Sequence, residues 1–240
     1  TLHFRTRPYD PWVGFSAPNP FGSYNAYAET TVSVQYRNVS RVDLALYTVA
    51  PEEMVKLIGK DFWQRWQKYA PQAESLLRRW SLPTQAPLNA TRTLSQTLAL
   101  AAGQRLTPGF YYLQASAPET KNVARQLLIV SDTNLTLKST QTEALVWATD
   151  LREGRPVTGL QVTIYDAEGQ RVAGGTTDGD GLLKAAIPEQ EPWQPLIVLA
   201  KRGTGYALVS RHWSDGLEPW SFNLSGSPSL ERFRAYLYTD

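Results

Sequence analysis

With 240 residues, 42% hydrophobic and 19% charged, the chain has the composition of a globular protein of one large or two ordinary domains. The formal net charge of +2 comes from 24 Lys and Arg against 22 Asp and Glu. These charges are dispersed, so nucleic acid is not expected as a partner. The absence of cysteine excludes disulfides and thiolate sites, and no run approaches the ~20 apolar residues of a membrane helix, so no membrane contact is expected.

Strands are predicted first, from apolar residues that alternate with polar ones. Residues 32–36 and 42–46 follow this pattern on either side of the polar segment 37–41, which predicts a hairpin. Pro108 and Gly109 have the order that a type II turn requires. The turn predicts that residues 93–100 and 110–115 are antiparallel neighbours.

A helical period interrupts these strands. Pro51 suits a first helical position, and apolar residues follow at helical spacing as far as Tyr69. After Pro71, residues 73–80 place Ala73, Leu76, Leu77 and Trp80 on one face of a second short helix. A partner groove or ligand box is one interpretation of this aromatic stripe, and a helical insertion at about 51–80 that covers a sheet is the favoured one.

A polar stretch, "SAPETKN", precedes residue 123, where we place a domain boundary and hypothesise flexing over 116–124. Beyond it, glycine turns around Gly169, Gly181 and Gly203 separate further strands. The predicted fold is all-β, with two tandem Ig- or fibronectin-like antiparallel β-sandwiches at 1–123 and 124–233. Residues 234–240 alternate up to the last position and predict the first strand of a following, truncated domain.

Residues that could carry catalysis are sparse. The two histidines, His3 and His212, have no ligand-type companions nearby in the sequence, and no nucleophile or phosphate-binding motif occurs. The "DGDG" at 178–181 hints at a calcium loop but is interpreted as a plain turn. We therefore expect no catalytic, cofactor-binding or metal-ligating residue, no cofactor, and no enzyme.

Tryptophans in loops are the remaining candidates for a site. Trp193, Trp213 and Trp220 lie among Pro and Gly, where exposed indoles of β-sandwich modules hold sugars or peptides. The alternative is that each indole packs within its own sandwich.

A resemblance makes the prediction more specific. Residues 144–188 contain "VWATD", "GRPVTGLQVTIYD" and "TDGDG", and this series resembles the macroglobulin-like domains of bacterial alpha-2-macroglobulins. The segment "NVSRVDLALYTV" is similar to a strand pair in an upstream domain of the same kind. The final "YTD" looks like the opening of the next domain. By position, the two halves are expected to be the second and third macroglobulin-like domains.

The resemblance implies a structural role. Members of the family are endopeptidase inhibitors that trap proteases through a bait region, often with a Cys-Gln thioester, and neither part occurs here. The expected function is therefore that of a scaffold, with neighbouring domains of the parent chain as partners, proteases met only through the full-length protein, and a periplasmic or cell-surface location. The alternative is a pair of Ig-like domains from a bacterial surface adhesin or carbohydrate-binding protein.

Overall fold

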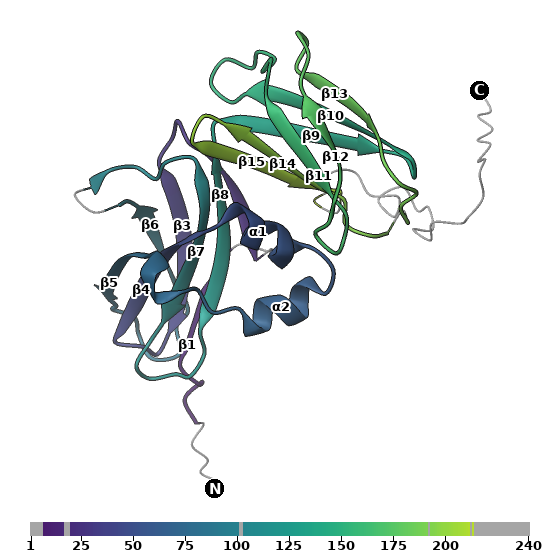
Figure 1. The fold of residues 1–240 in the computed structure, drawn as a ribbon. Coiled ribbons are helices and arrows are strands. Elements are labelled where there is room, and N and C mark those ends of the chain that lie inside the picture. Colours follow the sequence, from purple (N-terminus) through teal and green to yellow (C-terminus); the bar gives the residue numbers. More distant parts are fainter. Residues whose placement is uncertain (1–6, 17–19, 101–102, 192, 212, 214–240) are drawn as a thin grey trace, which may run out of the picture.

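A computed structural model describes residues 7–16, 20–100, 103–191, 193–211 and 213, and Figure 1 shows two β-rich units packed side by side. The predicted all-β class is confirmed. Among the described residues, no helix has both the length and the apolar character needed to cross a membrane. The strand predicted at 234–240 lies outside the described residues.

The first unit is a sandwich of a three-stranded sheet, in the order β1-β3-β6, and a five-stranded sheet, in the order β2-β8-β7-β4-β5. β2 and β8 run parallel, and the other paired strands of this unit are antiparallel. Side chains such as Val34, Leu44 and Leu113 fill the space between the sheets. The strands are β1 (Trp12–Phe15), β2 (Phe21–Asn25), β3 (Thr30–Arg37), β4 (Arg41–Val49), β5 (Leu76–Pro83), β6 (Arg92–Leu98), β7 (Gly109–Ser116) and β8 (Ala124–Ser131).

Two predicted strand pairings in this unit are wrong. β3 and β4 belong to different sheets, so the link between them crosses from one layer of the sandwich to the other. Residues 93–98 pair with β3 instead of β7, and Gly109 begins β7 without the positive φ of a type II turn. Alternation reports that one face of a strand is buried, but it does not identify the neighbouring strand.

The predicted insertion is helical only in its first part. α1 (Pro51–Ile58) and α2 (Phe62–Lys68) are separated at Gly59 to Asp61, and Asp61 adopts a left-handed conformation with φ of 58°. The second predicted helix is wrong, because η1 (Ala73–Ser75) leads directly into β5, which pairs with β4. Arg78, Trp80 and Leu82 alternate along β5, so the two-residue period was also present in the sequence.

The second unit is a smaller sandwich of two antiparallel sheets, in the orders β13-β10-β9 and β12-β11-β14-β15. Its hairpins around Gly169 and Gly203 form as predicted, and both glycines have positive φ. Val146, Ile164 and Val198 lie in the core between its sheets. The strands are β9 (Thr133–Ser139), β10 (Glu143–Asp150), β11 (Gln161–Tyr165), β12 (Arg171–Thr176), β13 (Leu182–Ala186), β14 (Ile197–Arg202) and β15 (Gly205–Ser210).

The border between the units differs from the predicted one at residue 123. β8, expected to open the second sandwich, is hydrogen-bonded to β7 and β2 inside the first unit. Residues 117–123 are therefore a loop within one sheet, and they are not a hinge between domains. The first unit ends at Ser131 and the second begins at Thr133.

Candidate functional site

The connection between the two units consists of the single residue Asp132. On either side of it, the hydroxyl of Ser131 donates to the carbonyl of Thr133 at 2.8 Å and accepts from the Thr133 N–H at 3.0 Å. The carbonyl of Asp132 accepts from the N–H of Leu151 at 2.9 Å. Because these backbone groups are hydrogen-bonded on both sides of Asp132, the connection has little freedom to allow rotation of one unit relative to the other.

A continuous apolar core joins the units beside this connection. The helix α1 contacts β14 of the second unit, and β7 and β8 contact β15 (Figure 1). Residues of β4 belong to the same apolar cluster. Met54, Leu127 and Ile197 are completely buried in this shared core. Interfaces within a chain are usually polar enough to allow domain motion, whereas an extensive apolar one makes the parts move together.

The sequence of β14 explains how one strand contributes side chains to two cores. Val198 and Ala200 point into the core of the second sandwich, whereas Ile197 and Leu199 point into the core shared with the first unit. Strands buried on both faces consist of unbroken apolar runs, and residues 196–200 and 127–130 are such runs. β8 and β14 are therefore built to be covered on two sides.

Aromatic side chains make up much of the first unit's contribution. Tyr112 is 1% exposed, and its ring centroid lies 5.9 Å from that of Tyr47, 5.6 Å from Trp66 and 5.1 Å from Tyr69, each in an edge-on arrangement. Burial raises the pKa values of both Tyr112 and Tyr69. The aromatic stripe predicted from the sequence thus faces the protein's own core, as the favoured interpretation held.

The bend between α1 and α2 makes a second set of polar contacts between the units. The N–H of Lys60 donates to the carbonyl of Ala167 at 2.7 Å, and the Lys60 ammonium lies 3.5 Å from Glu168. A Cβ on Gly59 would stand 2.5 Å from the Ala167 oxygen, which is closer than any side chain tolerates. Glycine at position 59 therefore allows this bend to contact the β11–β12 turn.

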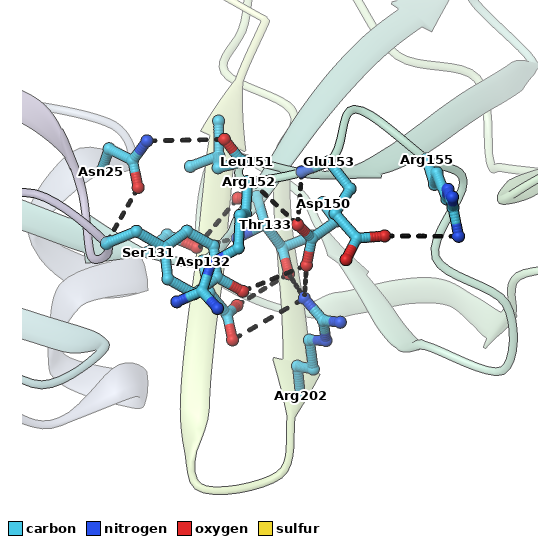
Figure 2. A network of polar contacts seen from close by, with 11 residues as sticks. Asn25, Ser131, Asp132, Thr133, Asp150, Leu151, Arg152, Glu153, Arg155 and Arg202 are labelled. Atoms are coloured by element: carbon cyan, nitrogen blue, oxygen red, sulfur yellow. Dashed lines mark hydrogen bonds and ion pairs between the residues drawn. The ribbon is translucent and has the colours of Figure 1, made fainter.

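A network of polar side chains joins the two units near Asp132 (Figure 2). Asp150, the last residue of β10, accepts hydrogen bonds from Arg202 at 2.7 Å and from the hydroxyl of Tyr27 at 3.1 Å. Its other carboxylate oxygen accepts from the N–H groups of Arg152 at 2.8 Å and Glu153 at 3.0 Å. Tyr27 belongs to the turn between β2 and β3, so Asp150 connects the first unit to two strands of the second.

Further contacts in this network join the same two turns. The guanidinium of Arg152 lies 4.0 Å from the centroid of the Tyr27 ring, a cation–π contact. The side-chain amide of Asn25 donates to the carbonyl of Leu151 at 3.5 Å (Figure 2). The guanidinium of Arg202 also lies 3.7 Å from the carboxylate of Asp132, so the connecting residue forms an ion pair with the same arginine.

Replacing Asp150 by Asn tests this network. Hydrogen bonding from Arg202 holds the pKa of Asp150 well below its usual range, so the folded state is favoured above the ordinary aspartate pKa of about 3.9 and this contribution is lost as the pH falls. We expect the variant to lose about 1–3 kcal/mol of unfolding free energy at pH 7. The loss should shrink progressively below about pH 4.

Denaturant titrations between pH 3 and pH 7 measure this difference. Glu153→Gln is the matched control, because Glu153 lies on the same turn and its side chain pairs, among the described residues, with the exposed Arg155. Exposed ion pairs contribute roughly 0–1 kcal/mol. A deficit for Asp150→Asn that stays constant over the whole pH range would contradict the assigned role.

The structure separates the predicted tryptophan sites. Trp213 packs on Phe21, with ring centroids 4.8 Å apart, and lines a cleft of about 450 Å³ between the units together with Ser23 and Thr133. Trp193 is 52% exposed and lines a different groove, which Trp63 also lines. Trp220 lies outside the described residues. Trp63 was not singled out from the sequence, because it belongs neither to the predicted apolar stripe nor to the Pro- and Gly-rich loops where tryptophans were considered.

The other sequence motif is part of a turn. The carboxylate of Asp178 accepts from the N–H groups of Asp180 at 3.0 Å and Leu182 at 2.8 Å. Within the described part of the chain, no three His, Asp or Glu side chains gather as metal ligands do. These contacts agree with the interpretation of "DGDG" as a turn.

The strand order and the shared core define the class of the protein as two β-sandwiches in tandem. The family model of the bacterial alpha-2-macroglobulin MG3 domain matches residues 130–229. A curated alpha-2-macroglobulin from Ralstonia nicotianae is 35% identical over 88 residues, which are 36% of this chain and 5% of that protein. The matched segment thus spans about a twentieth of the curated relative.

Solved structures agree with these matches. Native alpha-2-macroglobulin from Escherichia coli spanning domains MG0-NIE-MG1 has a TM-score of 0.68 at 18% identity, over 86% of this chain and 66% of that one. The Y1175G mutant of Salmonella alpha-2-macroglobulin has a TM-score of 0.64 at 19% identity, over 86% of this chain and 12% of that one. At these identities the structures show a shared fold.

The resemblance to bacterial alpha-2-macroglobulins that the sequence predicted is thereby confirmed. The family model begins at residue 130, two residues before Asp132, so it covers the second unit as the strand pairing defines it. Its description as an MG3 domain also agrees with the third position that we expected for this unit.

Proposed function

We propose that this chain is a non-catalytic scaffold within a bacterial alpha-2-macroglobulin, a broad-spectrum endopeptidase inhibitor that traps proteases. The observation that carries the proposal is the apolar core shared by both units, together with the single connecting residue. The 240 residues contain no cysteine, so a Cys-Gln thioester is not part of them. Neighbouring domains of the parent chain would be the direct partners, and proteases would be met through the whole protein.

Within such an inhibitor, we expect the chain to act as a rigid element, because its two units share an apolar core. A trap transmits a cleavage at one place into a rearrangement elsewhere, and this requires some elements that do not deform. Two sandwiches that share a core and are fastened at Asp150 and at Lys60 form such an element. A periplasmic or cell-surface location, which the family implies, belongs to the same proposal.

The test uses the full-length parent protein, mixed with trypsin. A trapped protease still cleaves a small chromogenic peptide but no longer cleaves a large protein substrate. We expect Leu199→Asp, which introduces a charge into the shared core, to reduce the protected fraction of trypsin several-fold. The control is Leu145→Ala, at a position that is 38% exposed on β10 and lies outside that core.

Two results would contradict the scaffold role. Unchanged trapping by a Leu199→Asp protein whose units have separated would show that rigidity is not required. Inhibition of proteases by the isolated 240-residue chain would show that the chain carries an inhibitory site of its own.

A further inference from the structure

A groove between the two units has a composition that the scaffold role does not explain. It has a volume of about 550 Å³ and is formed by the bend between α1 and α2, by the β11–β12 turn, and by the loop that leads into β14. Trp63, which is 64% exposed, and Trp193, which is 52% exposed, both line it. Large exposed indoles are uncommon on surfaces that face only water, and they are enriched where proteins bind other molecules.

The groove continues the junction between the units. Phe62 forms part of its wall, and its ring also packs edge-on against Phe21 at 5.5 Å, beside the shared core. Ala167 lines it as well, and the carbonyl of Ala167 accepts the hydrogen bond from Lys60. The walls of the groove are therefore fixed in position by contacts already described.

The polar groups of the groove include one carboxylate. The Lys60 ammonium is paired with Glu168, whereas the carboxylate of Asp61 has no hydrogen bond or ion pair to any residue that the structure describes. Gln64 and Gln194 add two side-chain amides, each of which can accept through its oxygen. The groove thus offers two exposed indoles, one carboxylate with no partner among the described residues, and two neutral amides.

We propose that this groove binds a polypeptide segment that presents an arginine side chain. A guanidinium is planar, stacks on aromatic faces and carries five N–H donors, so it complements both the indoles and the acceptors. A lysine ammonium matches the charge but offers neither the planar face nor the forked donors.

The molecule already contains the same combination of groups at its junction. There Arg152 lies over the ring of Tyr27, and the hydroxyl of Tyr27 bonds to the carboxylate of Asp150. Arg78 lies over Trp80 at 4.8 Å in a similar manner on β5. In the groove, the aromatic rings and the carboxylate are present, and the guanidinium is the group still to be supplied.

The experiment titrates the 240-residue chain with the peptide acetyl-Gly-Arg-Gly amide and follows the indole N–H resonances by NMR. The matched probe carries citrulline, a neutral isostere of arginine. We expect saturable shifts of the Trp63 and Trp193 resonances, with the citrulline peptide binding roughly threefold to tenfold more weakly. Trp193→Ala and Asp61→Asn should each weaken arginine-peptide binding by a similar factor.

Trp147→Ala is the control variant, because Trp147 is 44% exposed on β10 and does not line the groove. It should leave binding unchanged, and unaltered melting temperatures should show that all variants are folded. Equal binding of both peptides, no effect of Asp61→Asn, or no saturable shifts would overturn the proposal. Tighter binding of a neutral methyl glycoside at the same two indoles would overturn it in favour of a saccharide site.

Discussion

Leu199→Asp is expected to uncouple the two units of the isolated chain. Leu199 is 8% exposed and lies in the shared core, so the variant loses apolar burial and leaves a carboxylate without a partner. We expect a loss of about 3–5 kcal/mol from the junction. In calorimetry, the wild-type chain should melt in one cooperative transition, and the variant in two, because each unit keeps its own core.

Leu145→Ala is the appropriate comparison for this experiment. It removes the same apolar side chain from a position 38% exposed, where a change within about 0.5 kcal/mol is expected. Two transitions in the wild-type chain, or one unshifted transition in Leu199→Asp, would show that the units are not coupled through this core.

Tyr112→Ala is expected to have the second large effect. The ring is surrounded by Tyr47, Trp66 and Tyr69, so its removal leaves a cavity among side chains that cannot all close on it. Substitutions of this type cost about 3–5 kcal/mol. Denaturant unfolding should show a lower midpoint with an unchanged slope.

Tyr112→Phe separates the contribution of the ring to stability from that of its hydroxyl group. It keeps the three edge-on ring contacts, and volume-conserving substitutions of this kind usually cost less than about 1.5 kcal/mol. Equal losses for Phe and Ala would assign the stabilisation to the hydroxyl and would contradict the packing account.

Short-range sequence patterns were sufficient to predict much of the strand pairing in the second unit. Gly169 and Gly203 mark tight turns between neighbours in sequence, so each turn identifies both strands of its hairpin. In the first unit the partners are distant. β4 pairs with β5 and β7, and β8 with β2, and no short-range pattern specifies such pairings. For this reason the class of fold was predictable and the strand order was not.

The junction was missed because a domain border was placed at a polar segment. The polar residues of this segment lie mostly in the loop 117–123 between β7 and β8, whereas the real border at Asp132 lies between two strands and has no linker composition. The unbroken apolar runs of β8 and β14 were the available signal, since strands with both faces buried lack alternation. The network around Asp150 combines residues more than 100 positions apart, which a single sequence does not bring together.

The most direct test of the central claim, that both units move as one body, is a distance distribution between spin labels on Ser33→Cys in β3 and Lys138→Cys in β9. The chain has no native cysteine, so labelling is selective, and both positions are exposed. Pulsed electron resonance should give one narrow distribution, which broadens when Leu199→Asp is added. A broad or multiple distribution in the otherwise unchanged chain would contradict the account.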